Sequence, residues 1–163
     1  MGVNAKIEVL GVRETIAALN KIEPGLRKQF RDHATQIAQP AIAEVQKNYV
    51  RVPLSGMERR WSDRGRRLFP FEVNRARRGV VVSLDSRRKA ISVINIRQRD
   101  AGTAVFETAG RANQNQLGDS LGKLRPNRTR IIGPSVFRRR NQITSEMDRY
   151  VRATMERVQR EVR

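Results

Sequence analysis

The chain opens with alternating apolar and polar positions and changes to a helical spacing after Gly11. Ile7 and Val9 share one face of residues 6–10, which predicts a strand because successive side chains point to opposite faces of a sheet. After Gly11, apolar residues recur every three or four positions up to Pro24. This spacing predicts a short amphipathic helix that stops before Pro24.

A longer helical stripe runs from about Pro24 to Tyr49 and contains Pro40. The apolar positions stay in phase on both sides of that proline. A proline inside a helix removes one backbone hydrogen bond and bends the helix without necessarily ending it. We therefore expect one long, kinked helix over these residues.

Period-two alternation returns after the arginine-rich middle of the chain. Residues 80–84 predict a strand, residues 85–88 a turn and residues 91–95 the return strand of a β-hairpin. Residues 104–107 predict a late strand that adds to the same sheet.

The last periodic segment runs from about Asn141 to Glu161 and predicts a C-terminal helix. Its charged face carries the pairs Asp148→Arg152 and Glu156→Arg160, which have the i,i+4 spacing that favours an ion pair on a helix. Its apolar face consists of Ile143, Met147, Tyr150, Val151, Met155, Val158 and Val162.

Two segments lack periodicity and predict long loops. Residues 51–78 are rich in arginine and aromatic residues, and residues 109–130 are rich in glycine, asparagine and glutamine. Together with the periodic segments, they predict a single α+β domain over residues 1–163. It has a small, mostly antiparallel sheet of the N-terminal strand, the central hairpin and the late strand. This sheet packs against the long kinked helix and the C-terminal helix.

Net charge is the strongest compositional signal. Lys and Arg total 34 against 16 Asp and Glu, a formal charge of +18. Such a field favours an anionic neighbour, either nucleic acid or an acidic protein surface. The absence of cysteine excludes disulfides and thiolate metal sites. No apolar run reaches membrane-spanning length, and no signal-peptide core follows the N-terminus.

The pattern of chemically reactive residues does not predict an enzyme. His33 is the single histidine, and it lies beside the apolar stripe of the long helix. The carboxylates are scattered, and residues 118–122 lack the lysine that completes a phosphate-binding loop. We therefore expect no catalytic residue, metal or cofactor. A small nuclease, the enzymatic alternative, would need a carboxylate cluster that the sequence does not display.

The first loop and the start of the last helix contain the candidate binding residues. Trp and Arg are enriched in the energetic centres of protein interfaces, so we interpret the first loop as an interface. The same mixture also contacts phosphates and stacks bases, which leaves sequence-independent nucleic-acid binding as the alternative. The predicted interface residues are Arg59, Arg60, Trp61, Arg66, Arg67, Phe69 and Phe71. Three consecutive arginines before the C-terminal helix are suited to phosphate or to acidic partner groups: Arg138, Arg139 and Arg140.

Taken in order, these segments resemble the tail-component or tail-completion proteins of the head–tail joining modules of long-tailed bacteriophages. Residues 11–19 resemble the short opening helix of that family, and residues 26–49 its long helix. Residues 52–56, Val-Pro-Leu-Ser-Gly, resemble the turn that follows, and residues 104–107 the late strand. Residues 133–137, Gly-Pro-Ser-Val-Phe, resemble the proline segment before the last helix.

The resemblance implies a structural virion protein, assembled in the host cytoplasm and located at the head–tail junction. It implies a cyclic homo-oligomer, a hexamer or dodecamer, in contact with neck or connector proteins and with the tail terminator or tail tube. DNA in the channel would be contacted without sequence preference, and no membrane is involved.

Overall fold

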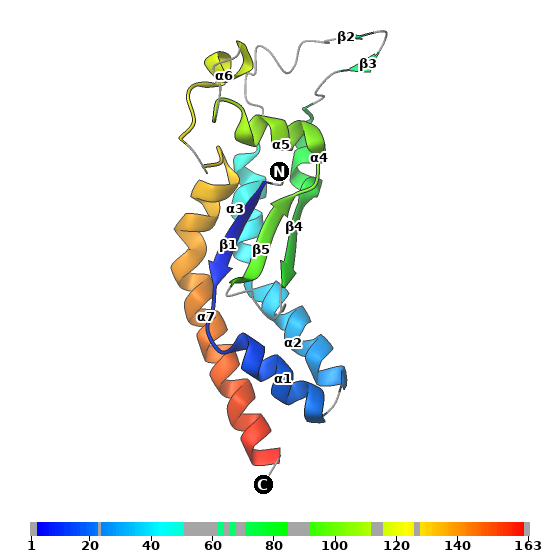
Figure 1. Ribbon diagram of the computed structural model, residues 1–163, viewed down its shortest axis with the longest axis vertical. Helices are drawn as coiled ribbons and strands as arrows, with labels where there is room; N and C mark the ends of the chain where they lie inside the picture. The colour runs from blue at the N-terminus through cyan, green and yellow to red at the C-terminus, as the bar shows by residue number, and fades with distance from the viewer. Residues whose placement is uncertain are drawn as a thin grey trace. The chain divides into compact units, whose positions relative to one another are not determined.

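The structure is a computed structural model that describes residues 3–22, 24–50, 62–63, 66–67, 71–84, 92–111, 116–125 and 128–161. It confirms the predicted α+β class (Figure 1). The chain divides into two compact units, each built from three stretches. The first unit comprises Met1–Ala5, Ile42–Val81 and Ile96–Phe137, and the second comprises Lys6–Ala41, Val82–Asn95 and Arg138–Arg163. The single domain stays a prediction.

Each unit has its own apolar core. In the first unit the buried side chains include Val3, Val45, Tyr49, Ala76, Val80, Ile96, Phe106, Ile132 and Val136. In the second they include Ile7, Val12, Ile16, Leu19, Phe30, Ala34, Ile37, Ile143, Met147 and Val151. These residues come mainly from the stripes that the sequence displays, which is expected because burial of one helix or sheet face drives the packing.

Three strands form an antiparallel sheet in the order β1 (Asn4–Glu8), β5 (Ser92–Gln98), β4 (Val80–Leu84), as Figure 1 shows. Adjacent β4 and β5 confirm the two strands of the predicted hairpin, whose turn lies outside the described residues. Strand β1 is an edge strand. In it Ile7 is buried while Glu8 is exposed, as the alternation predicts.

Helix α1 (Val12–Ile22) confirms the predicted short helix, with Val12, Ile16 and Leu19 buried. The turn into it is made by Gly11, whose φ of 77° lies in the left-handed region that favours glycine. A Cβ at Gly11 would also lie 3.1 Å from the side chain of Val151.

The long helix predicted over residues 24–49 is bent, as expected, and the bend is a one-residue interruption. Helix α2 (Pro24–Ile37) ends before Ala38, and helix α3 (Gln39–Asn48) begins after it. The amide of Ala41 donates to the carbonyl of Ala38 at 3.1 Å, which is the tighter i→i−3 pattern. Pro40 thus falls in the first turn of α3, where a missing N–H removes no helical bond.

Helix α7 (Ile132–Glu161) begins well before the predicted start near Asn141, so that boundary is wrong. Pro134 does not prevent the earlier start, because it stands in the first turn of the helix. An N–H at that position has no intrahelical partner to lose. The predicted apolar stripe is confirmed at Ile143, Met147, Val151 and Val158, all of which are buried.

The two ion pairs predicted on α7 are not formed. Among the described residues, neither Asp148 with Arg152 nor Glu156 with Arg160 approaches as an ion pair. Arg160 instead donates from Nε to the backbone carbonyl of Glu156 at 3.3 Å. Exposed pairs of this kind gain little, since fixing two long side chains offsets most of the attraction.

The late strand predicted over residues 104–107 is wrong, because these residues belong to helix α5 (Ala101–Thr108). Asp100 caps its N-terminus and accepts hydrogen bonds from the amide of Thr103 at 2.9 Å and from its hydroxyl at 2.7 Å. The cap satisfies an amide that the helix itself leaves free. Four residues are too few to separate a strand from a helix by periodicity.

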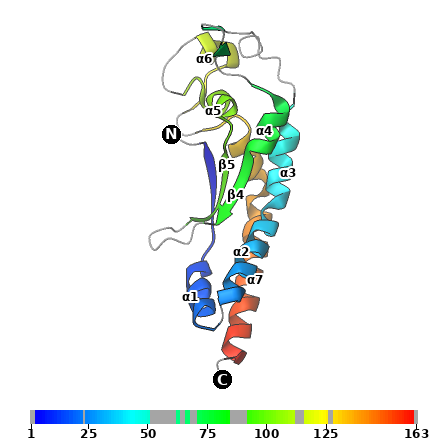
Figure 2. The same ribbon diagram turned by 90° about the vertical axis from the view of Figure 1, so that its right-hand side faces the viewer.

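Both predicted loops contain a helix. Residues 73–78 of the first loop belong to helix α4 (Val73–Gly79), and residues 116–121 of the second form helix α6 (Gln116–Leu121), so both assignments are wrong in part. Helix α4 lies beside α3 in Figure 2. Gln46 donates to the carbonyl of Arg77 at 3.1 Å, and Arg77 donates to the carbonyl of Gln46 at 3.1 Å.

Candidate functional site

The residues predicted as an interface lie mainly outside the described part of the chain. In strand β3 (Arg66–Arg67), Arg66 is opposite Asp63 and Arg67 is opposite Ser62 of strand β2 (Ser62–Asp63), in antiparallel backbone register. The role of the segment stays a prediction. Four of its residues lie outside the described residues: Arg59, Arg60, Trp61 and Phe69.

Phe71, the one described aromatic residue of that set, is half-buried. Its ring lies 5.2 Å from that of Phe106 at an interplanar angle of 57°, and Phe106 is 3% exposed. Tilted aromatic pairs stabilise a core beyond their area burial. Phe71 therefore contributes to the packing of the first unit, whatever part it has in an interface.

Arg138, Arg139 and Arg140 are exposed and lie within α7, not before the last helix as predicted. Successive residues of an α-helix are rotated by about 100°, so three consecutive arginines point in widely different directions. The structure therefore does not bring the three guanidinium groups together on one side of the helix. Their contact with phosphate or with an acidic partner stays a prediction.

The buried carboxylate of Glu107, which was not among the predicted site residues, lies inside the first unit, and the residue is 0% exposed. Its Oε2 accepts from the amide of Ile131 at 2.9 Å, and its Oε1 accepts from the amide of Ile132 at 3.2 Å. Ile132 is the first residue of α7. The carboxylate therefore caps this helix at the end where the macrodipole is positive.

Tyr49 is the third donor to Glu107. Its hydroxyl lies 2.5 Å from Oε1, and its side chain is 0% exposed. Burial raises the pKa of Tyr49 above its ordinary value, and the adjacent negative charge of Glu107 raises it further. The hydroxyl also accepts from Gln98 Nε2 at 3.3 Å, and the same nitrogen donates to the carbonyl of Ala76 at 3.0 Å.

Arg130 binds the C-terminal ends of two helices, whereas Glu107 binds an N-terminal end. Its guanidinium donates to the carbonyls of Phe106 at 3.1 Å and Ala109 at 2.7 Å, at the end of α5. It also donates to the carbonyls of Leu121 and Gly122, both at 2.7 Å, at the end of α6. Terminal carbonyls lack intrahelical partners, and a cation there meets the negative end of the macrodipole. Burial lowers the pKa of Arg130, which the charge of Glu107 opposes.

These contacts define the chemistry of the buried network. Both oxygens of Glu107 are occupied by protein donors, and its side chain has no exposed surface. The network thus joins helix ends inside the first unit. In the ranges that the structure describes, no three His, Asp or Glu side chains gather as metal ligands. The sequence signal for Glu107 was a charged residue directly after the apolar residues 104–106.

His33 lies on α2 with its ring 4.2 Å from that of Tyr150 on α7. The ring of Phe30 stacks on the same tyrosine at 5.0 Å and 17°. His33 is exposed, and these rings hold α2 against α7 in the second unit. The position accords with a packing role for the histidine.

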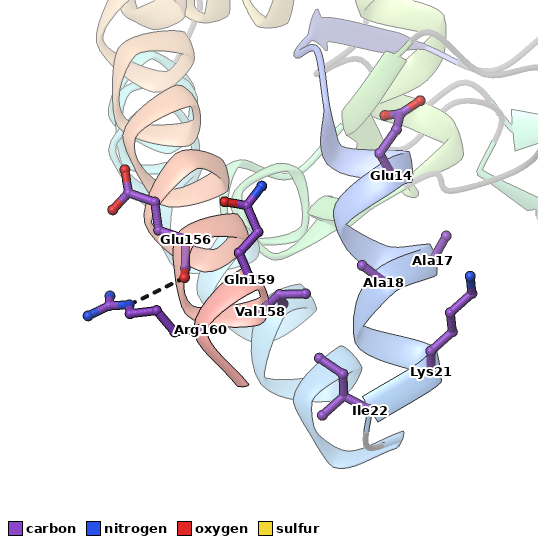
Figure 3. A pocket seen from close by; sticks show the side chains of 9 residues that line it. All are labelled: Glu14, Ala17, Ala18, Lys21, Ile22, Glu156, Val158, Gln159 and Arg160. Carbon is purple, nitrogen blue, oxygen red and sulfur yellow. Dashed lines mark hydrogen bonds between the residues drawn. The ribbon is translucent and has the colours of Figure 1, made fainter. Parts of the chain in front are cut away.

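A groove in the second unit runs between α1 and the C-terminal turns of α7. In Figure 3, Ala18 and Ile22 on α1 face Val158 on α7, while charged side chains surround them. The groove encloses about 1030 Å³. Its charged members carry both signs: Glu14, Lys21, Glu156 and Arg160.

A second groove in this unit lies between strand β1 and the middle of α7, and encloses about 720 Å³. Residues 6–8 form its strand side. Its helix side consists of Arg140, Asn141, Thr144, Ser145, Asp148, Arg149 and Arg152. It is a polar groove, and Arg140 is the one predicted contact residue that the structure places in it.

Helices in the described ranges are too short or too polar to cross a membrane. Comparison of the chain with protein-family models, with curated proteins and with solved structures found no match.

Proposed function

We propose that this chain is a structural protein of a tailed-phage virion. It would form part of the ring that joins the capsid connector to the tail around the DNA channel. The order of elements carries the proposal. A short helix, a long bent helix and a long C-terminal helix follow one another as the resemblance to tail-completion proteins implies. Helix α5 replaces the late strand, and residues 133–137 lie inside α7 and not before the last helix, so the proposal rests on the three helices.

The surface of the described residues supports a role in assembly. Leu10, just before α1, is 81% exposed, and Phe137 on α7 is 55% exposed. Burial of one such side chain against a neighbour stabilises an interface by about 1.5–3 kcal/mol. The two grooves described above combine strand or helix surface with charged side chains, which suits docking of a second protein.

The proposed assembly is a closed ring, a hexamer or dodecamer, placed between neck or connector proteins and the tail terminator or tail tube. A charge of +18 on each copy opposes self-association at low salt. Acidic surfaces on the neighbours would offset that repulsion. Ring closure is therefore expected to depend on the neighbours or on salt.

A second candidate function is sequence-independent nucleic-acid binding, which the exposed face of α7 favours. At about 100° for each residue, four exposed arginines of α7 fall within a sector of about 80°. Such a stripe suits a phosphate backbone, although Glu156 lies on the same face. The four residues are Arg138, Arg149, Arg152 and Arg160.

The test is to locate the protein in particles of the phage that encodes the chain. Gold-labelled antibodies against the chain should mark the head–tail junction, and a reconstruction of that region should contain a ring of copies that fit α7 and the sheet. Virions without the chain at the junction would refute the assembly role. If purified chain then bound duplex DNA, the second function would replace the first.

A further inference from the structure

Among the strands that the structure describes, β1 lies at the edge of the three-stranded sheet and leaves one row of its backbone groups unpaired within it. The carbonyl of Val3 accepts from the amide of Gln98 at 3.1 Å, so the backbone of Val3 faces β5. Backbone direction alternates along an antiparallel strand. The N–H and C=O groups of Asn4, Lys6 and Glu8 therefore point away from β5. An open edge of this kind is a template for another extended chain.

This edge lies at a groove and not at a flat surface. Residues 6–8 and the α7 residues opposite them line the same groove. A strand added there would find backbone partners on the β1 side. On the α7 side it would meet the hydroxyls of Thr144 and Ser145 and the amide of Asn141. These polar groups suit a peptide with polar side chains. An extended peptide would direct every second side chain to them, since side chains of a strand point alternately to its two faces.

Charge complementarity indicates the chemistry of that peptide. Cations in the lining outnumber carboxylates: Lys6, Arg140, Arg149 and Arg152 against Glu8 and Asp148. The surplus favours an anionic occupant. The two carboxylates disfavour a phosphate backbone, which carries charge at every unit and has no donors to pair with them. A peptide with acidic residues at alternate positions and backbone N–H groups satisfies both features.

This chain is a poor source of such a peptide. None of its 16 Asp and Glu residues is adjacent to another. The spacing of two, which places side chains on one face of a strand, occurs once, at Glu146 and Asp148, and both belong to α7. The acidic strand therefore belongs to a different protein.

We propose that an acidic, extended segment of a partner protein adds to the β1 edge and directs its carboxylates to Arg140, Arg149 and Arg152. The inference rests on the proposed function insofar as the partner is a neighbour in the junction. The backbone of the segment pairs with Lys6 and its neighbours, and its alternate side chains face α7. The groove is thus the site at which a neighbouring protein docks by strand addition.

The probe is a fluorescent peptide of about eight residues, the length of an ordinary strand, with alternating Glu and Val. Full-length protein should bind it, and a matched peptide with Gln for Glu should bind at least about tenfold more weakly. The variant R149E/R152E should lose binding, while R139E, which introduces the same kind of charge reversal outside the groove, should retain it. Equal binding of the Glu and Gln peptides would overturn the electrostatic part of the proposal.

Strand addition is tested through the backbone. Lys6→Pro removes an N–H that points away from β5, and proline is tolerated at such edge positions. It should weaken binding about tenfold or more, whereas Lys6→Ala removes the side chain and should weaken it far less. A peptide N-methylated at alternate residues tests the same bonds and leaves the protein intact. Two peptides are needed, one N-methylated at the odd-numbered residues and one at the even-numbered residues. If neither peptide binds more weakly than the unmethylated one, strand addition is overturned.

Two further outcomes separate this proposal from the assembly role. Binding of duplex DNA in place of the acidic peptide, lost in R149E/R152E, would assign the groove to nucleic acid and refute the peptide. Antibody labelling of virions decides the assembly role independently. A chain present at the junction that fails to bind the peptide would refute the docking groove and leave the proposed function standing.

Discussion

Glu107 and Arg130 are charges of opposite sign that bind helix ends. Glu107 accepts from the first amides of α7, and Arg130 donates to carbonyls at the ends of α5 and α6. Removing a charge from water is costly unless hydrogen bonds replace the lost hydration. Here the bonds go to backbone amides and carbonyls at helix ends, which have no partner within their own helix. Each contact therefore satisfies both the buried charge and a backbone group. The macrodipole adds about 0.3–1 kcal/mol at each end.

Replacement of Tyr49 by Phe tests this network. The variant removes one donor from a buried carboxylate, so Tyr49→Phe should lower the free energy of unfolding at neutral pH by about 1.5–3 kcal/mol. Urea denaturation of both proteins measures the difference. Tyr150→Phe removes the same atom from a half-buried ring and serves as control. An equal loss in both variants would contradict the role assigned to the hydroxyl.

The contact between Tyr49 and Glu107 also predicts how the free energy of unfolding depends on pH. Because the pKa of Tyr49 is raised in the folded state, the folded protein keeps a proton that the unfolded chain loses near pH 10.0. The associated stability is present below that pH and falls as the pH rises above it. The difference in unfolding free energy between the wild type and Tyr49→Phe should therefore shrink in alkali. A difference that stays constant above pH 10.0 would contradict it.

The sequence could not predict the partners in this network. Tyr49 and Glu107 are 58 positions apart. Tyr49 ends the apolar stripe of the long helix, and Glu107 directly follows the apolar residues 104–106. Hydrophobic periodicity places a residue on a face, but it does not say which distant residue meets it. The candidate interface was predicted from composition, and composition does not separate an interface residue from one that packs within its own unit. An aromatic residue beside arginines packs on Phe106 as readily as on a partner.

At the scale of elements, long periodic stretches were predicted well and short ones poorly. The stripes of α1 and of the bent helix extend over several turns, so their period is unambiguous. Strands β4 and β5 have only five and seven residues and were predicted from their alternation on both sides of a turn. Helices α4, α5 and α6 have eight residues or fewer. In such elements a cap or a tertiary contact decides the structure, as Asp100 does for α5.

Asp100→Ala should therefore destabilise the first unit. The carboxylate caps α5 through two bonds to Thr103 and lies 3.5 Å from Arg75. Loss of an N-cap costs about 0.5–2 kcal/mol, and the ion pair with the half-exposed side chain of Arg75 adds little. Chemical denaturation gives the magnitude. Asp100→Asn retains a capping oxygen and should recover most of the loss, and an Asn variant as unstable as the Ala variant would contradict the cap.

The aromatic residues of the arginine-rich segment give a matched pair. If Trp61 is an interface anchor, Trp61→Ala should weaken assembly by about 2 kcal/mol or more and leave the melting temperature of the free subunit nearly unchanged. Phe71→Ala should lower that melting temperature, because it removes the contact with Phe106. Calorimetry and sedimentation separate the two effects. Equal destabilisation of the free subunit by both variants would show that Trp61 belongs to a core.

At the scale of the whole molecule, the excess of cations favours an anionic neighbour. Of 34 Lys and Arg residues, Arg130 is occupied by helix ends and Arg75 by Asp100, while many others on α7 are exposed. Exposed like charges repel one another, and salt or an acidic partner reduces that repulsion. The acidic segment proposed to dock at β1 would be such a partner, and so would a neighbouring protein in the proposed junction.

DNA binding gives the last prediction. If the chain forms the proposed ring around a DNA channel, DNA must be able to slide through it, so the affinity of the free chain for duplex DNA should not depend on sequence. In a plot of the logarithm of affinity against the logarithm of salt concentration, each phosphate contact contributes about 0.9 to the steepness of the slope.

Arg138, Arg139 and Arg140 diverge around α7, so at most two can face one strand of DNA. Their joint replacement by Gln should lower the slope by about one to two and leave sequence preference unchanged. Salt titrations on two unrelated duplexes measure both quantities. A strong preference for one duplex at physiological salt would contradict the assembly role, because a site that reads bases would hold DNA in place.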